Sequence, residues 1–236
     1  MAEQFAIWRR STDIERGLAF LHAPYFLRPF TNKITPMRLH HLSLLLLIVC
    51  LPFCSFASRH AKLTAGSLEA LKSVKKMNIK FSYDSLTIGK DETPNDEYVK
   101  NRKEELNQKE GGKGSTWARE WVNDRTRRYE PGFRDYFNKT ECGIRVGNFP
   151  EEKYTMIFRS INLEPGYNVG VSRKNSLLTG EAWIVETANP SNVICRISID
   201  DAPGSMAGFD FDNGERIKMS YVVAGNAIGE LIRKEL

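Results

Sequence analysis

The feature that most constrains the fold is a series of strand-like segments followed by one long amphipathic helix. Residues 154–163 read YTMIFRSINL and are apolar on both faces, as in a central strand. Residues 180–187 and 193–200 flank the turn ANPSN and predict a hairpin. A helix from about Asn213 to Lys234 follows, because its apolar residues recur with a 3.6-residue period. The expected buried stripe comprises Ile217, Tyr221, Ala224, Ile228 and Leu231.

The first half of this region predicts one strand and two helices. MNIKFSYD, residues 77–84, alternates apolar and polar residues and predicts a half-buried strand. Thr93 as N-cap and Pro94 at the first helical position start a mostly solvated helix that ends near Lys109. A second helix starts near Ser115 and is expected to break at Pro131, and in it Asp124 and Arg128 form an i,i+4 pair.

The order of these elements predicts an α+β fold. With a short strand at Gly143–Val146, the chain reads strand, two helices, four strands and a final helix. We therefore expect a two-layer sandwich, with a mostly antiparallel sheet of about five strands and the helices on one face. Residues 77–236 form the single expected domain.

The connection between Leu163 and Gly180 is the longest one without an assigned element. A strand at Tyr167–Ser172 is one interpretation. A loop in which Tyr167, Arg173 and Lys174 recognise a ligand is another, and so is the tip of a hairpin.

The segment before the domain contains an apolar run from Leu42 to Ala57 that is too short for an ideal membrane span. Residues 37–57 resemble a signal peptide, with cleavage expected between Ala57 and Ser58. An uncleaved anchor and a lipoprotein signal are the alternatives. Residues 1–36 are expected to precede the true start of translation, and residues 58–76 to form a tether.

Composition limits the expected partners. Residues 1–57 carry six of the 34 basic and three of the 29 acidic residues, so the remaining 179 residues have a net charge of only +2. This balance argues against a nucleic-acid partner. The expected location is beyond the inner membrane, periplasmic or secreted, with membrane contact only through an uncleaved leader.

Histidine is nearly absent from the expected mature chain, where only His60 remains. One histidine near the terminus excludes a Ser-His-Asp triad, a Cys-His pair and a histidine-ligated zinc site in the folded body. We therefore expect no enzyme activity and no cofactor. Cys142 and Cys195 can pair in an oxidising compartment, but two buried thiols are the favoured interpretation.

The acidic stretch Asp200–Arg216 is the strongest candidate for a metal site. Asp210, Asp212 and Glu215 are the candidates for binding a hard cation such as Ca²⁺. The favoured alternative is a capping box, in which Asp212 caps the last helix and Glu215 stands three residues later.

Several stretches together resemble a family of small secreted or envelope proteins of Bacteroides-type bacteria. The matching stretches are VKKMNIKFSYD, FPEEKYTMIFRSINLEPGYNVG, ETANPSNVICRISIDDAPG and DFDNGERIKMSYVVAGNAIGELI, within residues 74–236. The resemblance implies an envelope location and no particular activity.

The leading functional hypothesis is an exported, non-catalytic binding or assembly accessory module, whose partner is another envelope protein or a glycan. One alternative is a small hydrolase that works with carboxylates alone, with candidates Asp200, Asp201, Asp210 and Glu186. A structural surface subunit is the other alternative.

Overall fold

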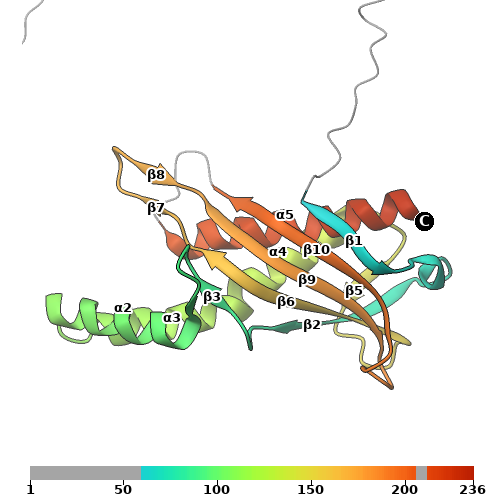
Figure 1. Ribbon diagram of the computed structural model, residues 1–236, viewed down its shortest axis with the longest axis horizontal. Helices are drawn as coiled ribbons and strands as arrows, with labels where there is room; N and C mark the ends of the chain where they lie inside the picture. The colour runs from blue at the N-terminus through green and yellow to red at the C-terminus, as the bar shows by residue number, and fades with distance from the viewer. Residues whose placement is uncertain (1–59, 206–211) are drawn as a thin grey trace, which may run out of the picture. The chain divides into compact units, whose positions relative to one another are not determined.

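A computed structural model describes residues 60–205 and 212–236 and shows an α+β fold (Figure 1). Within these residues one sheet of eight strands has the order β1-β10-β9-β6-β2-β5, with β3 beside β6 and β4 beside β3. Its strands are β1 (Ala61–Gly66), β2 (Lys76–Ser82), β3 (Thr87–Ile88), β4 (Thr93–Pro94), β5 (Arg145–Gly147), β6 (Tyr154–Glu164), β9 (Ser176–Glu186) and β10 (Val193–Gly204).

The sheet is mixed rather than mostly antiparallel. Strands β6, β9, β10 and β1 pair antiparallel, whereas β2 runs parallel to both β5 and β6. The prediction of about five mostly antiparallel strands is therefore wrong in number and direction. Side chains alternate with a period of two in both kinds of ladder, so a sequence pattern does not reveal direction. The helices between β2 and β6 provide the long crossover that a parallel pair needs.

Four α-helices are present in the described part of the chain: α2 (Asn95–Lys109), α3 (Lys113–Asp124), α4 (Glu130–Lys139) and α5 (Asn213–Glu235). A π-helical turn, η2 (Arg125–Tyr129), joins α3 to α4. The predicted break at Pro131 is wrong. Pro131 lies in the first turn of α4, where its missing N–H costs little, and the wide turn just before it changes the hydrogen-bond register.

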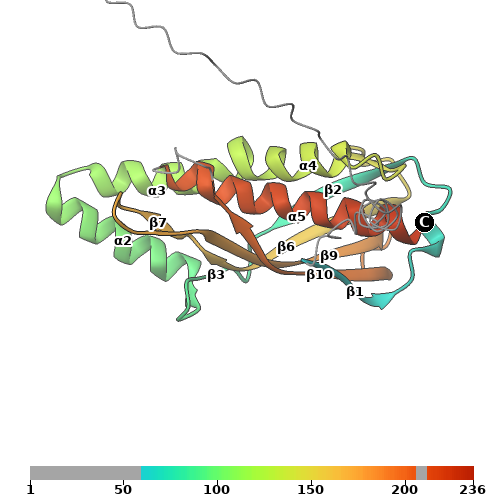
Figure 2. The same cartoon turned by 90° about the horizontal axis from the view of Figure 1, so that it is seen from above.

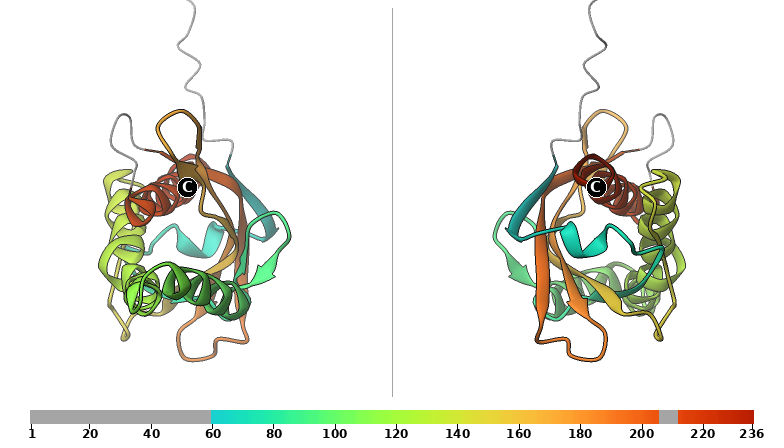
Figure 3. Two further views of the ribbon diagram at one scale, coloured as in Figure 1. Left: turned by 90° about the vertical axis from the view of Figure 1, so that its left-hand side faces the viewer. Right: turned by 90° about the vertical axis from the view of Figure 1, so that its right-hand side faces the viewer.

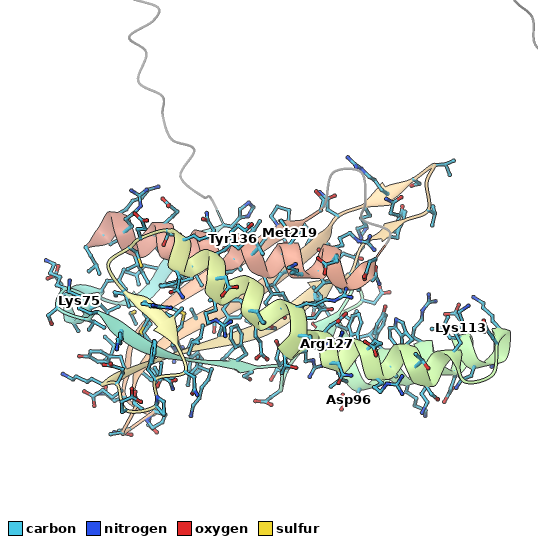
Figure 4. The ribbon with its side chains drawn as sticks, turned by 180° about the vertical axis from the view of Figure 1, so that it is seen from behind. Lys75, Asp96, Lys113, Arg127, Tyr136 and Met219 are labelled. Atoms are coloured by element: carbon cyan, nitrogen blue, oxygen red, sulfur yellow. The ribbon has the colours of Figure 1, made fainter. Side chains whose placement is uncertain are left out.

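Helices α4 and α5 lie side by side and cover one face of the sheet (Figure 2). The end views in Figure 3 show the sheet on one side and this helical layer on the other. Seen from behind, Tyr136 marks α4 and Met219 marks α5 in this layer, and Lys113 lies at the far end of the α2–α3 hairpin (Figure 4). Gly225 allows the close crossing, because a Cβ there would lie 2.2 Å from the Phe133 carbonyl oxygen.

The prediction for α5 is confirmed in most positions. Its expected apolar stripe is buried except Leu231, which is half-buried, while the neighbouring Ile232 is fully buried. Asp212 is the predicted N-cap, since its side chain accepts hydrogen bonds from the N–H groups of Gly214 and Glu215.

Two predictions near the N-terminal side of the domain are wrong. Residues 58–76 were expected to be a tether, yet β1 pairs with β10, and Leu71 in the short helix η1 (Glu69–Leu71) is fully buried. The six-residue sequence AKLTAG has no clear strand pattern, because β1 is stabilised by its pairing with β10. Thr93 and Pro94 pair with β3, so α2 begins one residue later than predicted, at Asn95.

No helix within residues 60–205 and 212–236 combines the length and apolar character needed to cross a bilayer. The predicted signal peptide, its cleavage position between Ala57 and Ser58, and the extension at residues 1–36 lie outside the described residues.

Candidate functional site

The predicted acidic metal site is occupied by helix-capping and ion-pair contacts where it is described. Asp212 caps α5, and its Oδ2 accepts a hydrogen bond from Arg128 at 2.8 Å. Glu215 lies 3.1 Å from Lys218 and 3.7 Å from Arg128. Asp210 lies outside the described residues. The two described carboxylates therefore already have cationic partners.

The candidate hydrolase carboxylates do not converge. Asp201 sits at a bulge in β10 with a φ of 47°, and its Oδ1 accepts a hydrogen bond from Thr179. Asp200, its neighbour, is exposed. Glu186 lies six residues along β9 from Gly180, which pairs with Ile199, so about 20 Å of strand separates it from the two aspartates. That separation exceeds the spacing that a glycosidase pair uses.

Cys142 and Cys195 are both buried free thiols. The Cys142 thiol donates to the Ile144 carbonyl oxygen at 3.5 Å. Burial raises the pKa of Cys195 to about 11, so this thiol stays protonated at neutral pH.

The connection between Leu163 and Gly180 forms a hairpin of β7 (Tyr167–Asn168) and β8 (Arg173–Lys174). Its tip exposes Val169 and Val171. Of the three interpretations, the hairpin is confirmed, and the two short strands β7 and β8 take the place of a single strand at Tyr167–Ser172. Tyr167 also lines a cleft at this end of the molecule.

Among the described clefts, this one gathers the most aromatic side chains, and it is called here the aromatic cleft. It has a volume of about 540 Å³ and lies between α2, α3, the β3–β4 turn, the base of the β7–β8 hairpin and the start of α5. Figure 1 places these elements together at one end of the fold. Its lining includes the side chains of Asp91, Tyr98, Arg102, Trp117, Glu164, Tyr167 and Arg216. The volume lies within the range typical of small-molecule sites.

Two helices position the aromatic side chains of the cleft. The rings of Tyr98 on α2 and Trp117 on α3 meet edge to face, with centroids 6.0 Å apart. Trp121, one turn further along α3, packs against both rings, and its ring centroid lies 5.4 Å from the centroid of each. Its indole N–H donates to Asn95 Oδ1 at 3.0 Å, which fixes the start of α2 against α3. The rings at the cleft are therefore held by a packed cluster.

Charged groups surround these rings. Arg102 lies 2.5 Å from Glu105 on the same helix, and Glu164 lies 2.6 Å from Lys174. Burial raises the pKa of Tyr98, Arg102 opposes this shift, and Glu164 adds to it. The Tyr98 hydroxyl therefore remains a neutral hydrogen-bond donor at ordinary pH.

Arg216 forms the floor of the cleft and is 1% exposed. Its Nε donates to the Pro165 carbonyl oxygen at 3.1 Å, and its guanidinium also bonds to Asn213. These contacts tie the end of β6 to the start of α5. The cleft thus combines aromatic rings, a neutral phenol and fixed guanidinium groups, which suit a polar ligand with an apolar face.

Tyr167 is a candidate from the sequence, whereas the helical spacing of Trp117 and Trp121 predicts that both pack in the core. Trp121 follows that prediction, since it is 6% exposed, whereas Trp117 is only partly buried. Helical spacing places both residues on one face. Of the two tryptophans, Trp117 lines the cleft together with Tyr167 of β7, which lies some 50 residues later in the chain. The sequence of α3 alone does not show this.

Comparisons with models of protein families and with curated proteins find no match. Among solved structures, the PelC dodecamer from Paraburkholderia phytofirmans is similar, with 10% identity and a TM-score of 0.32, over 70% of this chain and 96% of that chain. A variant of that dodecamer has 11% identity and a TM-score of 0.30, over 69% and 95% of the two chains. Scores this low do not establish a shared fold.

Proposed function

We propose that this chain is an exported, non-catalytic binding domain that takes a sugar-class ligand in the aromatic cleft. The observation that carries the proposal is the meeting of Tyr98, Trp117 and Tyr167, from three separate elements, around a cleft of about 540 Å³. Aromatic faces are electron-rich and attract the C–H face of a pyranose ring. The surrounding amide, phenol and guanidinium groups then hydrogen-bond its hydroxyls.

Three of the four charged side chains that line the cleft, those other than Asp91, favour binding over catalysis. A general acid or base needs a proton that it can exchange with a bound substrate. Glu164 is held by Lys174, and the guanidinium groups of Arg102 and Arg216 are hydrogen-bond donors without an acceptor atom. These groups suit the orientation of a ligand. Export remains part of the proposal because it rests on the signal-like segment at residues 37–57.

Calorimetric titration of the full chain with cellotriose, maltotriose and chitotriose tests the proposal. We expect at least one of these neutral sugars to bind. Trp117→Ala should weaken that binding by about tenfold, because it removes the indole ring that the cleft offers to the sugar. The matched control is Tyr136→Ala, which removes an exposed aromatic side chain of α4 outside the cleft.

Two outcomes contradict this function. The first is the absence of heat with all three sugars. The second is equal binding by wild type and by the Trp117→Ala variant, once circular dichroism shows that the variant is folded.

A further inference from the structure

The face of the sheet turned away from α4 and α5, called here the open face, carries a band of basic side chains. Strand pairing assigns its residues directly. Lys80, Ile157, Trp183 and Arg196 form one row across β2, β6, β9 and β10. Ser82, Arg159, Glu181, Ser198 and Lys62 form the next row, which continues onto β1. Residues paired in this way point to the same side of a sheet.

The centre of the band is an arginine–tryptophan–arginine cluster. The guanidinium carbons of Arg159 and Arg196 lie 4.5 and 4.3 Å from the centre of the Trp183 ring. The indole N–H of Trp183 donates to Glu181 at 2.8 Å, which fixes the ring. A stacked guanidinium keeps its N–H donors in its own plane, where they can grip a carboxylate with two hydrogen bonds. The cluster thus holds two oriented anion-binding groups.

The positive charge of the open face lies within these two rows, and exposed carboxylates follow beyond the second row. The two rows contain four cations and one carboxylate, Glu181, which lies 4.0 Å from Arg159. Beyond the second row, Asp84 follows β2 and Asp200 lies on β10, and both are exposed. An anionic chain that ran along the strands would meet these carboxylates. A chain laid across the strands meets only the band.

The band has the length of an extended polymer segment. From Lys80 on β2 to Lys62 on β1 it crosses four strand spacings, about 19 Å at roughly 4.8 Å each. Cations lie on four of its five strands, and the middle strand, β9, carries Glu181 and Trp183. A ligand with several negative groups along its length complements the cations on either side of β9.

We propose that the open face binds a linear carboxylated polysaccharide laid across the strands, with carboxylates on Arg159 and Arg196. Single-stranded nucleic acid needs aromatic rings on which its bases stack, and the Trp183 ring already contacts both guanidinium groups. An acidic peptide that adds to a sheet uses an edge strand, not the face. This surface is separate from the aromatic cleft, since none of the residues in the two rows lines that cleft.

Titration of the full chain with decagalacturonate at several NaCl concentrations tests this proposal, with maltodecaose and a ten-residue oligothymidylate in parallel. We expect decagalacturonate to bind best and its affinity to fall as salt rises. Arg159→Gln with Arg196→Gln should weaken that binding by about tenfold or more. Lys103→Gln with Lys234→Gln is the matched control, because it removes the same charge from exposed positions on α2 and α5.

A second pair of substitutions keeps the test decisive if loss of the arginines unfolds the protein. Lys62→Gln with Lys80→Gln removes the two exposed ends of the band and leaves the Trp183 cluster intact, so affinity should fall about threefold or more. An unchanged affinity in this variant overturns the proposal. So does an equal loss in the control pair, tighter binding of oligothymidylate, or no binding of decagalacturonate.

Discussion

Helix α5 buries side chains along its whole length, whereas no residue of α2 is buried. Helix α5 starts at a side-chain cap, while Pro94 at the start of α2 makes no capping hydrogen bond. One helix therefore gains its stability from the core, and the other lies against α3 at the end of the fold. The contrast indicates that α5 stabilises the core of the domain, whereas α2 serves mainly to form the aromatic cleft. Substitutions on α5 should therefore lower stability more than substitutions on α2.

The largest expected effect is at the centre of α5. Ile228 is fully buried, and Ile228→Ala removes methyl groups and leaves a cavity. We expect a loss of about 2–5 kcal/mol in the free energy of unfolding, measured by chemical denaturation.

The control on the same helix is Glu230→Ala, which removes a side chain that pairs with Arg233 near the surface. A change of less than about 0.5 kcal/mol is expected there. Equal costs at the two positions would mean that α5 does not pack as described.

The next largest effect is expected at the start of α5, in comparison with the start of α2. Asp212→Ala removes the cap of α5 and its contact with Arg128, and should cost about 1–2 kcal/mol. Asp96→Ala removes an exposed acid from the first turn of α2 and should cost about 0.5 kcal/mol or less. If Asp96→Ala costs as much as Asp212→Ala, the two helix ends do not differ in the way proposed.

The change in stability with pH that comes from the Asp212 cap of α5 should be smaller than the effect of removing the cap. Burial acts to raise the pKa of Asp212, but hydrogen bonds from Arg128 and from the Gly214 N–H lower it overall. A carboxylate with a depressed folded-state pKa stabilises the fold above its unfolded value of about 3.9. That contribution is lost as the pH falls through the lower folded-state pKa.

Denaturation of wild type and Asp212→Asn between pH 6 and pH 2 measures this contribution. The difference in stability between them should shrink below about pH 4. A difference that stays constant across this range would contradict the assignment of the charged cap.

The smallest effect is expected on the surface of α2. Glu105 pairs with Arg102 and Lys109, and these hydrogen bonds lower its pKa. The pair is exposed, so Glu105→Gln should leave the denaturation midpoint unchanged within error. A clear destabilisation would show that α2 contributes to the fold more than its exposure suggests.

Helix α5 was predictable because its local sequence and its environment agree. The apolar period and the Asp212 cap both lie within the segment itself, so its start and buried face could be read from sequence. The β9–β10 hairpin was predictable for the same reason, since a short turn joins its paired strands.

Elements stabilised by distant partners were missed. Strand β1 is short, and its hydrogen bonds come from β10, some 130 residues later in the chain. The parallel pairing of β2 with β6 depends on a crossover of three helices, which the strand sequences do not record. The aromatic cleft shares this property, since its residues range from Ile88 to Arg216.

The pairing of β1 with β10 also means that β1 can join the sheet only late in synthesis of the chain. Ala61 is among the first residues of the domain to leave the ribosome, yet its partner, Ile199, is among the last. Until then β1 has no strand to join, and Leu68 and Leu71 next to it have no completed core to enter. A nascent chain that stops short of residue 199 therefore presents an unpaired strand and apolar side chains to chaperones and to other chains.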